Sequence, residues 1–171
     1  MPASLKAERP SGPFSLRPIG WVSSPYQRRF GAPQQSAAVD SDAEAVLEMD
    51  AEQIPAGAFA DLAGIERIWI LSWLHRGGNW APMVRPPRGT RERRSLFATR
   101  SPDRPNPLGL SAVRLVRIEG CNLHVRGIDL IDGTPILDVK PYIPYADAFP
   151  DSKAGWVDQI PRNALQTPRR P

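Results

Sequence analysis

Residues 96–115 read LFATRSPDRPNPLGLSAVRL, and the rest of the fold is best understood from this stretch. Pro102, Pro105 and Pro107 each fix φ and remove a backbone donor, so this part cannot be a helix or an inner strand. From Leu110 onward apolar and polar residues alternate, which is typical of a strand. The stretch therefore predicts a stiff loop between two strands, and loops on a rigid scaffold are where function concentrates.

Three polar residues of this loop are candidates for binding: Arg100, Arg104 and Asn106. The prolines hold them in place at low entropic cost, as a site for an anionic or planar ligand requires. The alternative is a structural crossover whose arginines are solvated. The residue pattern favours the functional interpretation.

The composition indicates one globular domain built mainly from strands. Of 171 residues, 41% are hydrophobic and 23% are charged, and 20 are proline. So many prolines argue against a helical bundle and favour short strands joined by loops. We expect a disordered tail over 1–13, the domain over 14–158, and a polar, basic tail over 159–171.

The single cysteine and the apolar pattern exclude several classes of protein. Cys121 has no partner for an internal disulfide, and with two histidines it makes a structural zinc site improbable, so no metal is expected. No charged-then-apolar leader opens the chain, and no apolar run approaches the ~20 residues that span a bilayer. We therefore expect a cytoplasmic protein that is not in a membrane.

Alternating and apolar runs predict the strands. They lie at 16–22, 46–49, 65–74, 110–118, 122–126 and 135–139, and the alternation also continues over 128–131. The run 65–74 is the most apolar, and its β-branched content favours a strand covered on both faces over a buried helix. Residues 55–62 have helical spacing for one or two turns, and 140–147 read as a loop. The fold class is mainly β: a single β-barrel with long loops and one or two short helices.

Positive charge is concentrated beside the proline-rich loop. Residues 85–104 contain seven arginines and two acids, Glu92 and Asp103. The local charge of this segment, +5, therefore exceeds the net charge of the whole chain, +4. The guanidinium fork suits phosphate and stacked bases. A solvated charged face is the alternative explanation, and clustering beside the loop makes nucleic-acid or phosphate binding about equally plausible. The seven are Arg85, Arg88, Arg91, Arg93, Arg94, Arg100 and Arg104.

Three groups of loop residues are candidates for a common binding site, because the familiar catalytic and nucleotide-binding motifs are absent. The chain has no P-loop, no Rossmann glycine pattern and no nucleophile elbow, and Cys121 lacks a histidine to activate it. The groups are 34–37, His75 and Arg76 with the arginines that follow, and 129–134. In the last, Gly133 would let backbone approach a ligand such as the edge of an adenine, but this motif alone favours an ordinary Asp-Gly hairpin turn.

Four motifs closely resemble the TsaA/TrmO-like family of S-adenosylmethionine-dependent tRNA methyltransferases. They are FATRSPDRPNPLGL at 97–110, DLIDGTPILDVKPYIPY at 129–145, VRPPR at 84–88 and IGWVSSP at 19–25. The resemblance implies a non-Rossmann β-barrel methyltransferase that acts as a homodimer, with cofactor near the subunit interface. It also implies methyl transfer to N6 of N6-threonylcarbamoyladenosine at tRNA position 37.

The resemblance further implies the ligand-binding residues. Cofactor contacts carried over by motif are Gln35, Ser36, Ala37, His75, Arg76, Arg104, Leu115, Leu130, Ile131, Asp132 and Gly133. The RNA-binding candidates are Arg85, Arg88, Arg91, Arg93, Arg94 and Arg100. The chain departs from the family pattern at 34–37, where Arg-Gln-Pro-Gly is usual, and at 89–92, where Leu-Gly-Gly-Asn is often found.

A base is needed to remove the N6 proton, because the carbamoyl group makes that nitrogen a poor nucleophile but its N–H more acidic. Asp138, Lys140 and Tyr142 alternate along one strand and its exit, so their side chains should share one face. We take them as the candidate catalytic residues. A structural Asp138–Lys140 salt bridge is an equally plausible alternative.

Two other functions are compatible with the same residues. One is a methyltransferase of another RNA or of an adenosine-like small molecule, which the altered loops favour. The other is a non-catalytic module that binds S-adenosylmethionine or RNA.

Overall fold

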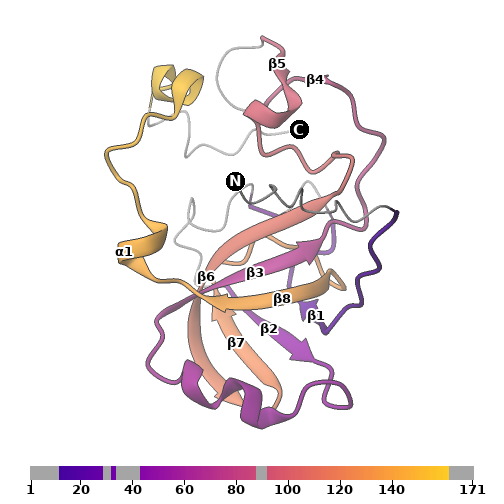
Figure 1. Ribbon diagram of the computed structural model, residues 1–171, viewed down its shortest axis with the longest axis vertical. Helices are drawn as coiled ribbons and strands as arrows, with labels where there is room; N and C mark the ends of the chain where they lie inside the picture. Colours follow the sequence, from indigo (N-terminus) through magenta and orange to yellow (C-terminus); the bar gives the residue numbers. More distant parts are fainter. Residues whose placement is uncertain (1–11, 29–31, 34–42, 88–91, 162–171) are drawn as a thin grey trace, which may run out of the picture.

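Six strands close into an antiparallel barrel, which confirms the predicted fold class (Figure 1). The computed structural model describes residues 12–28, 32–33, 43–87 and 92–161. In spatial order the strands are β1 (Gly20–Ser23), β2 (Glu44–Met49), β7 (Asn122–Arg126), β6 (Leu108–Glu119), β3 (Arg67–Trp73) and β8 (Pro135–Pro141). A 3₁₀ helix, η1 (Ala56–Leu62), occupies the segment expected to form one or two helical turns.

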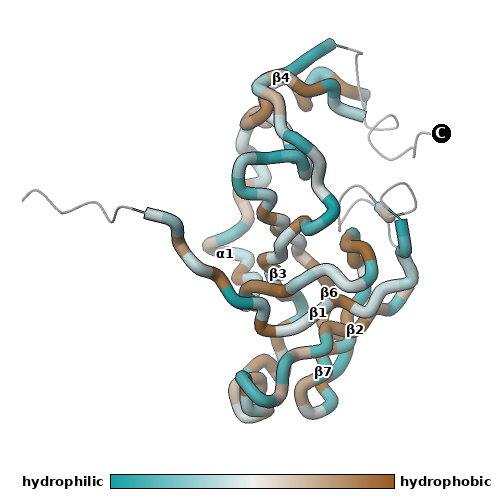
Figure 2. The backbone as a smooth tube through the Cα atoms, turned by 90° about the vertical axis from the view of Figure 1, so that its right-hand side faces the viewer, coloured by the Kyte–Doolittle hydropathy of each residue, from teal (hydrophilic) through white to brown (hydrophobic). Residues whose placement is uncertain are grey.

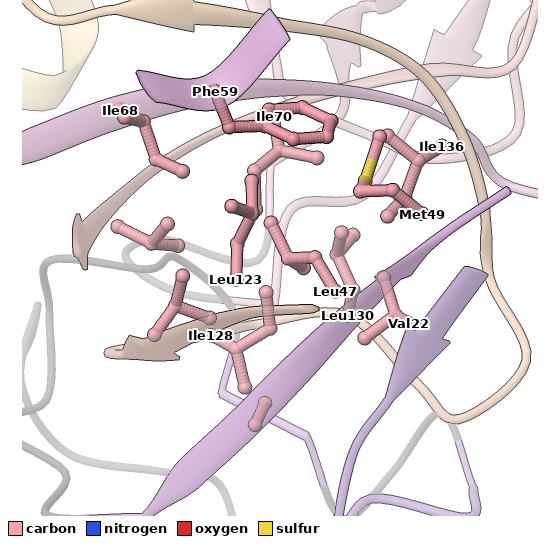
Figure 3. Close-up of a cluster of buried hydrophobic side chains, with 13 residues drawn as sticks. Val22, Leu47, Met49, Phe59, Ile68, Ile70, Leu123, Ile128, Leu130 and Ile136 are labelled. Atoms are coloured by element: carbon pink, nitrogen blue, oxygen red, sulfur yellow. The ribbon is translucent and has the colours of Figure 1, made fainter. Parts of the chain in front are cut away.

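The barrel interior is filled by alternate residues of the strands, as an inward-facing period of two requires (Figure 3). Ile68 and Ile70 of β3, Leu47 of β2 and Leu123 of β7 have no exposed surface, and Phe59 of η1 packs against the same cluster. The hydrophobic core therefore lies inside the strands, and the connecting loops are left to form sites at the barrel ends.

The prediction that 65–74 is covered on both faces was wrong. In β3 the inward residues Ile68, Ile70 and Ser72 are buried, whereas Trp69 and Leu71 on the outer face are half-buried. A single antiparallel barrel has only one interior, so the outer face of β3 is not covered by a second layer. This leaves an apolar outer surface.

The alternation over 128–131 correctly predicted buried side chains, but the prediction that these residues form a strand was wrong. Ile128 and Leu130 are buried, with 1% and 4% of their surfaces exposed, yet no strand includes them. The predicted loop over 140–147 also differs, because β8 continues to Pro141 and a one-turn helix, α1 (Pro144–Asp147), follows. Pro144 begins this helix, where its missing N–H costs nothing.

A smaller part of the chain lies above the barrel. It contains the two-residue strands β4 (Met83–Val84) and β5 (Arg94–Ser95) and the 3₁₀ turn η2 (Leu96–Ala98), all at the top of Figure 1. A second 3₁₀ turn, η3 (Gly155–Gln159), packs on η2, because Trp156 Nε1 donates to the Ala98 carbonyl at 2.9 Å. Figure 2 shows hydrophilic stretches between β4 and the barrel strands.

The predicted tails fall largely outside the described residues, at 1–11 and 162–171. Ile160, within the expected C-terminal tail, is buried with 8% of its surface exposed. Among the described residues, no helix has the length and apolar character needed to cross a membrane.

Candidate functional site

The Asp132–Gly133 turn is fixed to the segment that follows β1. Asp132 Oδ1 accepts the Ser24 backbone N–H at 3.0 Å, and the Asp132 backbone N–H donates to the Tyr26 carbonyl at 2.8 Å. Gly133 has φ of +71°, and a Cβ there would meet nothing within 4 Å. The predicted tight turn is confirmed, and its backbone borders open space that a ligand can approach.

His75 and Arg76 follow β3 and join the same segment. Arg76 Nη1 donates to the Gln27 carbonyl at 3.1 Å, one residue beyond Tyr26. Burial and the neighbouring Arg76 charge lower the pKa of His75 below its ordinary value of 6.5. The imidazole is therefore mostly neutral at pH 7, and one ring nitrogen can accept a proton or a hydrogen bond.

The proline-rich loop (99–107) is hydrogen-bonded to residues 74–78, which we call the His75 segment. The Leu74 N–H donates to the Pro107 carbonyl and the Gly78 N–H to Asp103 Oδ1, each at 2.7 Å. Within the loop, Arg104 Nη1 donates to the Thr99 carbonyl at 3.0 Å. The structure thus brings together the Asp132–Gly133 turn, the His75 segment and the Arg104 loop at one end of the barrel.

A buried polar layer lies on strands β3 and β6 next to this end. Ser111 Oγ donates to Asp129 Oδ1 at 2.5 Å, and Asp129 precedes the Leu130–Gly133 segment. The buried Ser72 Oγ has no hydrogen-bond partner among the described residues. Gly109 lies opposite Ser72, and a Cβ at Gly109 would be 2.4 Å from that oxygen.

Sequence reasoning did not find Ser72 and Ser111. The available signal was a polar residue at an inward position of an apolar strand, as in the series Ile68, Ile70, Ser72.

The remaining cofactor candidates are placed differently. Leu130 is buried in the core and Ile131 is half-buried. The Leu115 N–H donates to the Glu66 carbonyl, which precedes β3, whereas His75 follows β3. Within one chain, Leu115 is therefore not brought to the His75 segment. Gln35, Ser36 and Ala37 lie outside the described residues.

The candidate RNA-binding arginines fall into three sets. Arg85, Arg93 and Arg100 are exposed and make no ion pair with any residue in the described ranges. Arg94 is already engaged, since it pairs with Glu92 at 2.6 Å and lies 5.4 Å from the Trp156 ring centroid. Arg88 and Arg91 are outside the described residues.

Asp138, Lys140 and Tyr142 lie along β8 and its exit. Asp138 is opposite Leu71 and Lys140 is opposite Trp69 on β3, and the Tyr142 ring centroid is 5.4 Å from that of Trp69. Lys140 Nζ is 2.7 Å from Asp138 Oδ2, so the two side chains form an ion pair. The three side chains therefore belong to the outer face of the barrel beside β3.

That outer face is apolar on β3 and β6. Leu71 pairs with Leu110, and Trp73 pairs with Leu108. Leu110 is 59% exposed and Leu108 is 43% exposed. Neighbouring exposed apolar side chains of this kind mark interaction surfaces.

No group of three or more histidine, cysteine, aspartate or glutamate side chains able to hold a metal ion occurs in 12–28, 32–33, 43–87 or 92–161.

The chain is similar to known proteins over most of its length. It is 39% identical over 155 residues to the Escherichia coli (strain K12) tRNA (adenine(37)-N6)-methyltransferase, covering 86% of this chain and 66% of the relative. It is 46% identical over 121 residues to the Eikenella corrodens protein of the same name, covering 60% of this chain and 69% of that one. The chain thus spans about two thirds of the length of these curated relatives.

Solved structures agree with the sequence relatives. A crystal structure of TrmO from Pseudomonas aeruginosa matches with a TM-score of 0.70 and 35% identity, covering 84% of this chain and 62% of that chain. A second TrmO crystal structure matches with a TM-score of 0.72 and 35% identity, covering 85% and 64%. The family model described as "tRNA-methyltransferase O N-terminal domain" matches residues 21–148. The chain therefore belongs to the tRNA-methyltransferase O N-terminal domain family.

Proposed function

We propose that this chain transfers a methyl group from S-adenosylmethionine to N6 of N6-threonylcarbamoyladenosine at position 37 of tRNA. The observation that carries the proposal is the meeting of the His75 segment, the Arg104 loop and the Asp132–Gly133 turn at one end of the barrel. Membership of the family and the names of its relatives supply the reaction class.

The described residues fit S-adenosylmethionine chemically. Arg76 and Arg104 supply guanidinium donors for a carboxylate, and the open backbone at Gly133 can meet the polar edge of an adenine. The unpartnered Ser72 hydroxyl adds a buried polar group beside the same loops. When bound, the cofactor supplies an electrophilic methyl group, so the protein must bind, orient and deprotonate.

The full set of residues that we propose for the cofactor is Gln35, Ser36, Ala37, His75, Arg76, Arg104, Leu115, Leu130, Ile131, Asp132 and Gly133. For RNA we propose the exposed Arg85, Arg93 and Arg100, together with Arg88, Arg91 and Arg94.

Asp138, Lys140 and Tyr142 are the proposed catalytic residues. In the ion pair the Asp138 carboxylate is the proton acceptor, whereas the Lys140 ammonium has no lone pair while it keeps its proton. This favours Asp138 for removal of the N6 proton, with Lys140 orienting the carboxylate. Tyr142, against Trp69, borders the same surface.

We also propose that the protein is a cytoplasmic homodimer. The apolar outer face of β3 and β6 supports the dimer, because it leaves Trp73, Leu108 and Leu110 exposed in one chain. A second copy on this face would place the candidate catalytic residues of β8 beside the interface. It would also offer a way to bring Leu115 to a cofactor site.

Labelled S-adenosylmethionine and tRNA provide the direct test. Incubation with tRNA that carries N6-threonylcarbamoyladenosine, followed by digestion to nucleosides, is expected to give labelled N6-methylated product. Equal labelling of tRNA without the threonylcarbamoyl group would instead indicate another RNA substrate. Binding of the cofactor without formation of S-adenosylhomocysteine would indicate a non-catalytic module.

The catalytic assignment has its own test. The variants Asp138→Asn, Lys140→Met and Tyr142→Phe are compared for turnover and for cofactor affinity. Loss of the base is expected to lower kcat by about 10²–10⁴-fold while the Kd of S-adenosylmethionine changes little. If all three variants keep turnover within about threefold of the parent, the base lies elsewhere.

A further inference from the structure

Phe97 is an aromatic ring held out into solvent by a firmly anchored turn. The ring is 76% exposed, whereas the preceding Leu96 of η2 is buried with 2% exposed. The Leu96 N–H donates to the Pro82 carbonyl at 2.9 Å, and both the N–H and the Oγ1 of Thr99 donate to the Leu96 carbonyl. Trp156 closes the other side through the Ala98 carbonyl. The backbone is fixed, so the ring stays exposed.

A guanidinium group covers one face of this ring. Arg104 Cζ lies 5.2 Å from the Phe97 ring centroid, a cation–π distance. Arg104 is itself held by the Thr99 and Ser101 carbonyls at 3.0 and 3.5 Å. A lone exposed aromatic residue is unremarkable, but a ring on an anchored turn, next to a guanidinium that backbone carbonyls hold, forms a stacking platform.

The charge around the platform matches a nucleic acid. Arg100 lies three residues from Phe97, and Arg93 four residues from it, and both are exposed without an ion pair in the described ranges. Cationic side chains for phosphates combined with an aromatic face for a base are what single-stranded RNA recognition requires. An apolar protein partner would not need the arginines.

The platform adjoins the proposed site. Arg104 belongs to the loop whose Asp103 accepts the Gly78 N–H and whose Pro107 accepts the Leu74 N–H. A base stacked on Phe97 is therefore next to the His75 segment. We propose that Phe97, backed by Arg104, stacks an unpaired RNA base that neighbours the methylated adenosine in the anticodon loop. This inference rests on the proposed function for the identity of the RNA.

The test uses an anticodon stem-loop RNA with 2-aminopurine at each position that flanks the target adenosine. Phe97→Ala is expected to weaken RNA binding by about 5–150-fold, the range that corresponds to ~1–3 kcal/mol of base stacking. Phe97→Trp is expected to bind within about threefold of the parent and to keep the quenching of 2-aminopurine. Phe14→Ala is the matched control, because Phe14 is 78% exposed and lies far from this loop in sequence.

Salt dependence separates stacking from phosphate contact. Phe97→Ala is expected to leave the slope of log affinity against log salt unchanged, since it removes no charge. Arg100→Gln is expected to make that slope shallower by the amount that corresponds to about one phosphate contact.

Three results would overturn the platform. Unchanged RNA affinity in Phe97→Ala shows that no base stacks there. A loss of S-adenosylmethionine affinity by calorimetry, with RNA binding intact, shows that the ring stacks the cofactor adenine instead. A changed oligomeric state shows that the ring contacts a second copy.

Failure of the proposed function gives a different pattern. In that case no methylated nucleoside forms, while flanking 2-aminopurine is still quenched by the parent and not by Phe97→Ala. Normal methylation and binding by Phe97→Ala would reject the platform alone.

Discussion

At the scale of single residues, two buried serines on adjacent strands differ in one respect. Ser111 donates its hydroxyl to Asp129 at 2.5 Å, whereas the Ser72 hydroxyl has no partner among the described residues. Both side chains are almost completely buried, at 2% and 0% exposed. A buried polar group costs free energy when it is unpaired and stabilises modestly when it is paired.

Alanine substitution at these serines is therefore expected to have opposite effects. Ser111→Ala removes one hydrogen-bond donor from the Asp129 carboxylate, which is expected to lower the free energy of unfolding by about 1–3 kcal/mol. Ser72→Ala removes an unpaired hydroxyl, so it is expected to raise the free energy of unfolding by about 1 kcal/mol. Urea unfolding measures both values. A loss in Ser72→Ala as large as that in Ser111→Ala would show that the Ser72 hydroxyl has a partner in the folded protein.

At the scale of elements, an ionic cluster ties β2, β7 and β6 together on the outside of the barrel. Glu44 of β2 pairs with Arg126 of β7 at 2.7 Å and with Arg117 of β6 at 3.5 Å. Arg117 also pairs with Glu119, which contacts His124 of β7 at 3.0 Å. The cluster crosses two strand boundaries, so it favours the observed register of all three strands.

The pH dependence of Glu44→Gln tests this cluster. Hydrogen bonding to Arg126 lowers the pKa of Glu44 below its ordinary value of 4.5. Because the folded pKa is below the unfolded one, the stabilisation is complete above about pH 4.5 and is lost as pH falls through the folded pKa. Glu44→Gln is thus expected to lower Tm at pH 7 and to differ less from the parent at pH 3, as measured by calorimetry.

Glu48→Gln is the matched control, because Glu48 is exposed on the same strand and makes no ion pair in the described ranges. Its Tm is expected to stay close to the parent at both pH values. A loss of Tm in Glu44→Gln that persists unchanged at pH 3 would contradict the electrostatic explanation.

The strands show where sequence reasoning succeeds and where it stops. Alternation located β6, β7 and β8, and the apolar, β-branched run at 65–74 located β3, because inward apolar positions determine a strand locally. It misassigned 128–131, where side chains are buried without a backbone ladder. It also missed β4, β5 and α1, since elements of two to four residues exist through tertiary contacts such as Trp69 Nε1 to Asp147 Oδ2 at 3.0 Å.

The site was predictable to the same degree. Loop composition and the family motifs identified His75, Arg104 and the Asp132–Gly133 turn, and the structure brings their segments together. The sequence does not reveal that the carbonyls of Tyr26 and Gln27 tie two of these segments to one another, because any residue can supply a carbonyl. The engagement of Arg94 with Trp156 also depends on chain closure over 62 residues.

At the scale of the whole molecule, the outer apolar face gives a prediction about assembly. Leu110→Lys places a charge on the proposed dimer face and is expected to weaken self-association at least tenfold, since burial of an unpaired charge costs about 2–5 kcal/mol. Sedimentation equilibrium measures the effect. Leu16→Lys is the control, because Leu16 is 60% exposed, as Leu110 is at 59%, but precedes the barrel.

Two outcomes would contradict the assembly. A parent protein that sediments as a monomer at all concentrations rejects the homodimer. If the Leu110→Lys and Leu16→Lys variants dimerise equally well, the interface lies on another face of the barrel.

The six strands of the barrel close on themselves, and this has a consequence for how the molecule can evolve. With the ladder complete around the ring, no row of main-chain N–H and C=O groups is left to accept a strand from another molecule. The barrel strands can then recognise a partner only through their side chains, and backbone contacts are left to loops such as the Asp132–Gly133 turn. Specificity for one RNA or another can change by single substitutions in the loops, while the ring that carries them stays as it is.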